Sequence, residues 1–268
     1  MYPHASDWLA SLSERAQADK LQHLYVLIDS TALAYPLQQR LHALPSPPLQ
    51  ARLLDGLPES ALAEQGPILL RIQLNDSSQF AWLVEATTEL LREQRLLVLL
   101  SAWSFEALAQ HLSHHVQAEW DQGQNNGLLR YYDPRLFLAT CEMLDPKQAK
   151  RFHAPVIAWH WLDRDGSEAH FPGMPQPASV MPTPLPPLQL SNAQVASLMA
   201  WTSAELLRRD YALQPQDYAL ATRESLLRHI THAQLAADRA GRYDNTRDGY
   251  VLDWLAANSA TAPAREEA

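Results

Sequence analysis

The chain has 268 residues, of which 47% are hydrophobic and 19% are charged, and it contains eight Trp and nine Tyr. That is enough apolar material for one large domain or about two ordinary ones, and it excludes intrinsic disorder over most of the length. The formal charge is −9. Because no cluster of Lys and Arg interrupts this acidic background, we expect no binding to nucleic acid.

Three features of the sequence predict a cytoplasmic protein. Apolar runs such as 96–102 are far shorter than the roughly 20 residues that a membrane helix needs, so no membrane contact is expected. Tyr2, Pro3 and His4 do not resemble the basic and then apolar start of a signal sequence. A single cysteine, Cys141, cannot form an internal disulfide, which fits a reducing compartment.

The first part of the chain alternates helices and strands. Trp8, Leu12 and Ala16 recur at helical spacing, and the β-branched and aromatic run 24–28 is typical of a buried strand. The same criteria predict strands at 68–74, 96–100, 128–132 and 156–162, with helices at 36–41, at 77–93, from Ser104 past the His111 region, and at 135–144. Strand, helix and strand in succession indicate a βαβ unit. We therefore predict an α/β (α+β) N-terminal lobe over residues 1–168, with a mixed sheet flanked by helices.

Proline marks the end of this lobe. The segment between Phe171 and Leu190 has almost no charge and contains Pro172, Pro175, Pro177, Pro182, Pro184, Pro186 and Pro187. Such a composition favours a semi-extended chain. We predict a proline-rich linker over residues 169–190.

Helical periodicity dominates after the linker. A first helix carries Val195, Met199, Thr202 and Leu206 on one face. Pro215 opens a second helix that ends at Gly241, and a third short helix follows. We predict a small all-α C-terminal lobe over residues 191–258 and a flexible tail over 259–268.

Several common catalytic motifs are missing from the sequence. The chain has no G-x-S-x-G nucleophile elbow and no glycine-rich phosphate loop. Glu85 and Glu89 lie one helical turn apart, but with Arg92 nearby they are typical of a solvated helix face. Cys141 lies on a predicted amphipathic helix, which favours a buried small side chain over a reactive thiol. We therefore expect no catalytic residue and no cofactor.

Histidines supply the main alternative to that expectation. His229 and His232 share a helix face at i, i+3, and His111, His114 and His115 form a second group. A metal site needs three or four convergent ligands, and the nearby Glu224 and Asp238 have no recognised metalloenzyme spacing. Surface or partly buried histidines without a metal are the favoured interpretation. A small metal-dependent hydrolase is the rival hypothesis.

Residues 129–135, with the sequence LRYYDPR, are the most distinctive segment of the chain. Asp133 followed by Pro134 is a strong helix start, and Arg130 and Arg135 bracket the carboxylate. We predict that the arginines and Asp133 form a charge network at a strand-to-helix corner, with Tyr131 and Tyr132 on alternate faces of the strand. A recognition patch is the alternative, because Arg and Tyr are enriched at interface hot spots.

With this segment the sequence resembles the type VI secretion effector adaptor/chaperone family, whose most distinctive signature is a strand running into R-[FY]-Y-D-P-R. Other pieces resemble the family in order over about residues 24–161: Tyr25–Asp29, Leu53–Gly56, Gly66-Pro67, Ser104–Leu112, and Phe152–Pro155 with Trp159. The family places its first strand almost at the N-terminus, whereas a helix precedes it here. The helical lobe contains no matching motif.

The resemblance implies a bacterial, non-enzymatic adaptor that binds a cognate effector in the cytoplasm and helps to load it onto the valine-glycine-repeat spike protein. The helical lobe and the cleft between the lobes are then expected to grip the effector. The candidate partner-binding residues are Trp103, Arg130, Tyr131, Asp133 and Arg135 at the signature corner, and Trp201 and Arg208 in the helical lobe. A toxin-neutralising immunity protein is a further alternative, because it would also be acidic, cytoplasmic and without enzyme activity.

Overall fold

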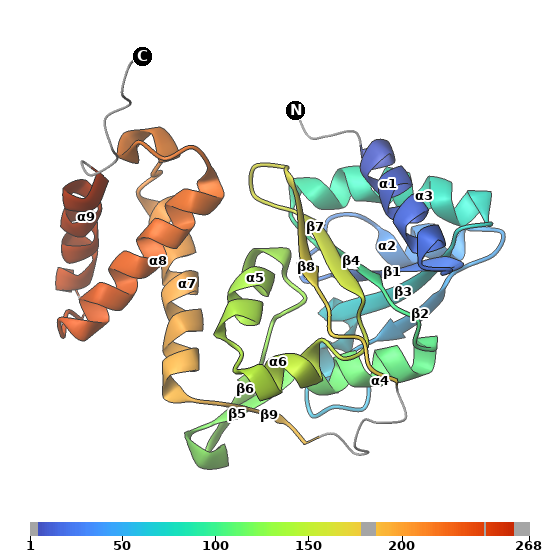
Figure 1. Ribbon diagram of the computed structural model, residues 1–268, viewed down its shortest axis with the longest axis horizontal. Helices are drawn as coiled ribbons and strands as arrows, with labels where there is room; N and C mark the ends of the chain where they lie inside the picture. The colour runs from blue at the N-terminus through green and yellow to red at the C-terminus, as the bar shows by residue number, and fades with distance from the viewer. Residues whose placement is uncertain (1–4, 178–185, 244, 260–268) are drawn as a thin grey trace. The chain divides into compact units, whose positions relative to one another are not determined.

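The computed structural model describes residues 5–177, 186–243 and 245–259 (Figure 1). The chain forms two compact units, Met1–Leu190 and Ser191–Ala268. The predicted fold class is confirmed, because the first unit combines sheets with flanking helices and the C-terminal region is helical. No helix in the described part of the chain is both long and apolar enough to span a membrane.

A six-stranded sheet organises the first unit, in the order β2-β3-β1-β4-β7-β8. The strands are β1 (His23–Asp29), β2 (Leu49–Arg52), β3 (Pro67–Gln73), β4 (Leu96–Leu100), β7 (Ala158–Leu162) and β8 (Glu168–Pro172). All neighbours in this sheet are antiparallel. Parallel pairing occurs instead in a three-stranded sheet of β6 (Asn125–Leu128), β5 (Gln117–Trp120) and β9 (Leu188–Leu190), between β5 and β9.

The predicted strand–helix–strand unit is present as β3, α3 (Ser77–Arg92) and β4. Its two strands are not neighbours, because β1 lies between them and is antiparallel to both. Strands β3 and β4 therefore run in the same direction on either side of β1. Local periodicity located the elements, whereas the insertion of β1 depends on pairing between distant segments.

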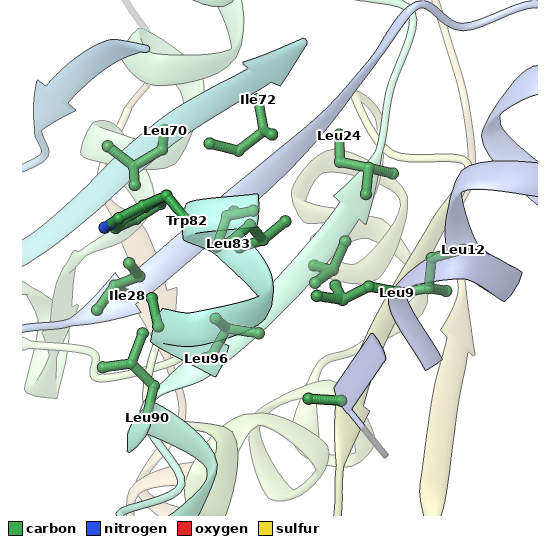
Figure 2. Packing of buried hydrophobic residues seen from close by; sticks show 14 of the residues in the cluster. Leu9, Leu12, Leu24, Ile28, Leu70, Ile72, Trp82, Leu83, Leu90 and Leu96 are labelled. Carbon is green, nitrogen blue, oxygen red and sulfur yellow. The ribbon is translucent and has the colours of Figure 1, made fainter. Parts of the chain in front are cut away.

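One face of the six-stranded sheet carries an aliphatic core. Even-numbered strand residues such as Leu24, Val26, Leu70 and Val98 point to this face, since successive strand side chains alternate. Helices α1 (Ala5–Ala18), α2 (Leu37–His42) and α3 cover it. Figure 2 shows the packing, with Leu9 and Leu12 of α1 and Trp82, Leu83 and Leu90 of α3 against the strands. The helix before the first strand is thus part of the core.

The opposite face carries aromatic residues. Tyr25 of β1 faces Leu99 of β4, which in turn faces Trp159 of β7. Phe105 of α4 (Phe105–His115) stacks on Tyr25 with a ring-centroid distance of 6.4 Å. Helices α5 (Pro134–Met143) and α6 (Pro146–Phe152) contribute Phe137 and Phe152, whose rings lie 4.8 and 5.6 Å from Trp159. In Figure 1, α1 and α3 lie at the top of this unit, and α4 and α6 lie at the bottom.

Two predictions for the first unit, a strand and the linker, are corrected. The strand expected at 128–132 ends at Leu128, and residues 129–133 form an irregular segment and a turn. The helix predicted from Ser104 is present as Phe105–His115, and β5 follows it. The sequence did not predict α6. The linker expected at 169–190 contains β8 and β9 at its two ends, and residues 178–185 lie outside the described residues. Short 3-10 helices occupy Ser60–Gln65 and Asp121–Gly123.

Just after β8, the backbone at Gly173 stays hydrogen-bonded to the segment before β7. Its backbone N–H donates to the Ile157 carbonyl at 2.8 Å, which extends the pairing of β8 with the β7 segment. A Cβ atom at this position would lie 1.6 Å from the Val156 carbonyl oxygen. The close backbone approach therefore requires glycine.

The second unit consists of helices α7 (Asn192–Asp210), α8 (Arg223–Arg239) and α9 (Asn245–Ser259), with a 3-10 turn at Pro215–Tyr218. The second predicted helix is therefore two elements, and α9 is longer than the short helix expected. Ser191 and Thr222 cap α7 and α8 through their side-chain oxygens. The buried side of α7 consists of Ala200, Trp201, Ala204 and Leu207. Met199 and Leu206, on the face that the sequence singled out, are exposed.

Candidate functional site

Asp133 organises the start of α5 at the predicted corner. Its Oδ1 accepts a hydrogen bond from the Arg135 backbone N–H at 3.0 Å and thereby caps the helix, and Pro134 occupies the first helical position. The Arg135 guanidinium also forms a bidentate ion pair with this carboxylate, with Nε donating to Oδ1 at 2.9 Å and Nη2 donating to Oδ2 at 2.8 Å. The predicted cap and the predicted contact between Asp133 and Arg135 are confirmed.

A second buried carboxylate, Asp29 at the end of β1, joins the corner. Its side chain has no exposed surface. Oδ2 accepts from Arg95 Nη1 at 2.9 Å and from Arg130 Nη2 at 3.0 Å, while Oδ1 accepts from the Thr31 backbone N–H at 3.1 Å. Arg130 therefore connects the end of a central strand to the helix that follows the corner.

Arg130 bridges the two buried aspartates. Its Nη2 contacts Asp133 Oδ2 at 3.4 Å in addition to Asp29. Burial disfavours the charged guanidinium, but the carboxylates of Asp29 and Asp133 outweigh burial and raise the pKa of Arg130 above its ordinary value. The resulting order of charges is Arg95, Asp29, Arg130, Asp133 and Arg135. Both carboxylates already accept arginine and backbone donors, so the corner offers outside molecules arginine donors rather than an open acid or base.

The two tyrosines of the corner are structural. Tyr131 is fully buried, and its hydroxyl donates to the Leu112 carbonyl of α4 at 2.8 Å. Burial raises the pKa of Tyr131 well above its ordinary value. Tyr132 is also buried, which raises its pKa to about 12, and its ring centroid lies 6.0 Å from the Arg130 guanidinium carbon. Since both residues follow the last strand residue, the predicted alternation on a strand is wrong.

Buried histidines surround the aromatic residues behind the corner. His111 and His115 of α4 have ring centroids 4.3 Å apart, and His111 Nε2 lies 3.2 Å from the Phe152 carbonyl. His153 Nδ1 accepts a hydrogen bond from Trp159 Nε1 at 3.0 Å. Burial lowers the pKa of His111 and of His153 to about 4, and that of His115 well below its ordinary value. These histidines are therefore uncharged components of the core at neutral pH.

The other proposed contact residues differ in accessibility. Trp103 is half-buried, and its Nε1 donates to the Gln176 carbonyl at 2.7 Å. Trp201 is buried. Arg208 is half-buried and pairs with Glu205 at 3.0 Å. In this structure Tyr131, Asp133 and Trp201 are thus not on the surface, whereas Arg130, Arg135, Trp103 and Arg208 are partly accessible.

The other groups that the sequence offered for chemistry are the histidines of the second unit, the Glu85 and Glu89 pair, and Cys141. His229 packs against Trp254 with a ring-centroid distance of 5.0 Å, and His232 is exposed. No group of three His, Cys, Asp or Glu within the described ranges is arranged to hold a metal ion. Glu85 pairs with Arg40 beside Glu89 in a cavity of about 620 Å³ between α2 and α3. Cys141 is buried as predicted, and burial raises its thiol pKa well above the ordinary value.

The sequence interpretation missed two members of the corner, Asp29 as a carboxylate partner and Arg95 altogether. Asp29 was visible as an acidic residue that closes an apolar strand, a position where a buried charge needs a partner. Arg95 lies just before β4, which runs beside β1, and the Asp29 backbone N–H donates to the Arg95 carbonyl at 2.9 Å. Its role depends on strand order, which local patterns do not determine.

Comparison with known protein families gives a match for this part of the chain. A family model described as "Domain of unknown function (DUF4123)" matches residues 24–163. The matched region extends from β1 through the corner to the end of β7, and it begins after α1. No curated protein and no solved structure matches the chain.

Proposed function

Because the chain belongs to the DUF4123 family, which is associated with type VI secretion effector adaptors, we propose that it is a non-catalytic adaptor that binds a cognate toxic effector in the bacterial cytoplasm and helps to load it onto the spike protein. The match over residues 24–163 carries this proposal. It includes the corner, so the most distinctive sequence segment coincides with a buried charge network.

Two properties of the first unit support a binding role. The corner fixes the start of α5 to the end of β1 through paired buried charges, and such a network holds its donors in place before a partner arrives. Arg130 and Arg135 expose 39% and 33% of their side chains. Arginine is enriched at interface hot spots, so these two residues are the corner's contact candidates, and Tyr131 acts as their support.

The second unit offers a different kind of surface. Met199 and Leu206 of α7 are 65% and 45% exposed, and Tyr211 just beyond the helix is 49% exposed. From Asn192 to Ala204 the helix has no charged side chain. Exposed apolar side chains next to an uncharged helix stretch are suited to covering by another polypeptide. We propose this face of α7, in place of the buried Trp201, as the effector contact of the helical unit.

Co-purification tests the proposal directly. The full chain is co-expressed with the effector encoded beside its gene and with the spike protein, and the complexes are measured by affinity capture and size-exclusion chromatography. We expect a stable complex with the effector and loss of effector secretion, but not of effector abundance in the producing cell, when the adaptor gene is deleted. Absence of binding together with unchanged secretion would contradict an adaptor.

The same deletion separates the alternatives. An immunity protein predicts that its loss kills the cell through its own toxin, whereas loss of an adaptor leaves the toxin undelivered. A metal-dependent hydrolase predicts stoichiometric metal in the purified protein that is lost when His229 and His232 are both changed to Ala.

A further inference from the structure

Strand β8 forms one edge of the six-stranded sheet and lies beside β7 (Figure 1). Hydrogen bonds just beyond both of its ends set the pattern of this pair. The Asp163 backbone N–H donates to the Ser167 carbonyl at 2.9 Å, and the Gly173 N–H donates to the Ile157 carbonyl at 2.8 Å. In an antiparallel pair such positions alternate with positions whose N–H and C=O point away from the partner. The odd-numbered residues of β8 therefore bond to β7, and the even-numbered residues turn their backbone groups outward.

These outward backbone groups belong to exposed residues. Glu168 and His170 each present an N–H and a C=O, whereas Pro172 presents a C=O alone. Within the described part of the chain, no other backbone or side chain forms a hydrogen bond with these groups. Unpaired N–H and C=O groups along a sheet edge are a template for a further strand. Because proline has no N–H, Pro172 limits this template to a short segment.

The opposite edge of the sheet, β2, is less open. By the same alternation, Gln50 and Arg52 turn their backbone groups outward there. The Arg52 carbonyl, however, already accepts a hydrogen bond from the Asp55 N–H at 3.2 Å, and the Arg52 side chain lies 3.7 Å from Glu64. Strand β8 is therefore the edge with more unused backbone groups.

Side chains along β8 narrow the class of segment that fits. Glu168 is exposed and has no ion-pair partner among the described residues. The whole chain carries a charge of −9, so a second copy would bring like charge to this edge, whereas a basic side chain would complement it. On the other face of the strand, Ala169 and Phe171 are half-buried, and Phe171 stacks on His153 at 4.9 Å between ring centroids. A neighbour on that face is best matched by apolar side chains.

We propose that an extended segment of the effector adds a strand to the outer edge of β8, with a Lys or Arg side chain beside Glu168 and apolar side chains beside Ala169 and Phe171. This inference rests on the proposed adaptor function and names the kind of segment that is bound. Strand β8 lies beyond the residues that match the family, 24–163.

Hydrogen exchange of the backbone amides tests the contact without any substitution. The full chain is measured alone and when saturated with the effector encoded beside its gene. We expect the amides of Glu168 and His170 to exchange more slowly in the complex, because each gains a hydrogen-bond acceptor. Peptides that cover β2, at the opposite edge, are the internal control and should not change. Unchanged exchange over 168–172 in a saturated complex would overturn the proposal.

A substitution at the edge separates backbone recognition from side-chain recognition. His170→Pro removes an outward N–H that has no role in pairing with β7, so the thermal midpoint should stay close to that of the parent chain. We expect roughly tenfold or weaker binding of the effector by calorimetry, because a hydrogen bond is lost and the proline ring blocks the edge. The matched control, His170→Thr, keeps the N–H and should bind within about twofold of the parent chain. Equal affinities of the two variants would contradict a strand addition.

The charge of the segment is tested separately. Glu168→Gln should weaken binding about two- to fivefold at low salt and by less at high salt, as expected for an exposed ion pair. An unchanged affinity at low salt would overturn the assignment of a basic side chain beside Glu168.

Other outcomes distinguish this contact from the adaptor function itself. If the full chain alone forms a dimer that His170→Pro dissociates, the edge belongs to a second copy and the proposal is wrong. If the parent chain binds the effector without protection of β8, the adaptor function stands and the strand addition fails. If the parent chain does not bind the effector, the adaptor function fails, and the proposed contact fails with it.

Discussion

Helices cover both faces of the six-stranded sheet, but the two faces differ in chemistry. On the face of α1, α2 and α3, the core consists mainly of Leu, Ile, Val and Ala side chains around Trp8 and Trp82. On the face of α4, α5 and α6, rings such as Tyr25, Phe152 and Trp159 pack with buried histidines, and the charge corner closes one end.

Because of this difference, the two faces should respond differently to substitutions. Aliphatic packing is non-directional and depends on the volume that is filled. Buried polar groups depend on individual partners, so each of them fixes one geometry and is costly when a partner is removed. Asp29 lies on the aromatic face, since it follows Tyr25 and Leu27 at alternate positions of β1. The face that holds the candidate site is therefore the face on which single substitutions should have the most specific effects.

Removal of the Asp29 carboxylate is expected to have the largest effect. Asp29→Ala removes the carboxylate that accepts hydrogen bonds from both Arg95 and Arg130. The Arg95 side chain, which is only 14% exposed, then loses a buried partner. We predict a loss of about 3–5 kcal/mol in the free energy of unfolding, measured by urea denaturation at pH 7. Asp19→Ala at an exposed position is the control and should change it by less than about 0.5 kcal/mol. Equal effects of the two variants would show that the network does not stabilise the fold.

The second effect is expected from acid, which should lower the free energy of unfolding through the buried histidines of the aromatic face. His111 and His153 have pKa values lowered by burial to about 4 in the folded chain, against an ordinary value of 6.5. Between pH 6.5 and pH 4 the unfolded chain binds protons that the folded chain does not, so stability falls as the pH falls through this window. At pH 5 each histidine should lower the free energy of unfolding by about 2 kcal/mol relative to pH 7. Denaturant titrations at a series of pH values measure this loss.

A variant assigns the acid effect to a residue. His111→Gln has no titrating ring and should reduce the loss between pH 7 and pH 5 by about 2 kcal/mol. His160, on the aliphatic face, also has a pKa lowered by burial to about 4, so part of the pH dependence should persist in this variant. An unchanged pH dependence would mean that His111 is accessible to protons in the folded chain.

A substitution in the aliphatic core should cost stability through lost volume and leave the pH dependence unchanged. Leu83 of α3 is fully buried in that core (Figure 2). Leu83→Ala is predicted to lower the free energy of unfolding by about 3 kcal/mol through lost burial and a residual cavity, with a pH profile parallel to that of the parent chain. Leu62→Ala, at a side chain that is 52% exposed, is the control. A changed pH profile in Leu83→Ala would indicate that the cavity alters the surroundings of a buried histidine.

The elements with the strongest patterns were predictable. Strand β1, helix α3 and strand β4 were expected close to their observed bounds, because long apolar runs and helical periodicity are local signals. Short or polar elements were not. Helix α6 has seven residues, and β5 and β6 have four each. The β6 sequence, NNGL, also carries no apolar alternation.

The face of α7 illustrates a different limit. Val195, Met199, Thr202 and Leu206 share one side of the helix, as the spacing predicts, but Met199 and Leu206 are exposed, and the buried side instead uses Ala200, Trp201, Ala204 and Leu207. Small residues pack closely against a neighbouring helix, so two alanines beside a tryptophan and a leucine form a good contact face. A single helix does not reveal which of two partly apolar faces its neighbours will cover.

The sequence by itself determined that this chain folds into an α/β part followed by a helical part, that Asp133 begins a helix, and that Arg130 and Arg135 lie beside its carboxylate, because these features depend on neighbours within a few residues. Tertiary structure alone decided that β1 separates β3 from β4 and that the Asp29 carboxylate accepts from both Arg95 and Arg130. The last contact joins residues 101 positions apart, and such contacts follow from strand order and burial, which no local pattern contains.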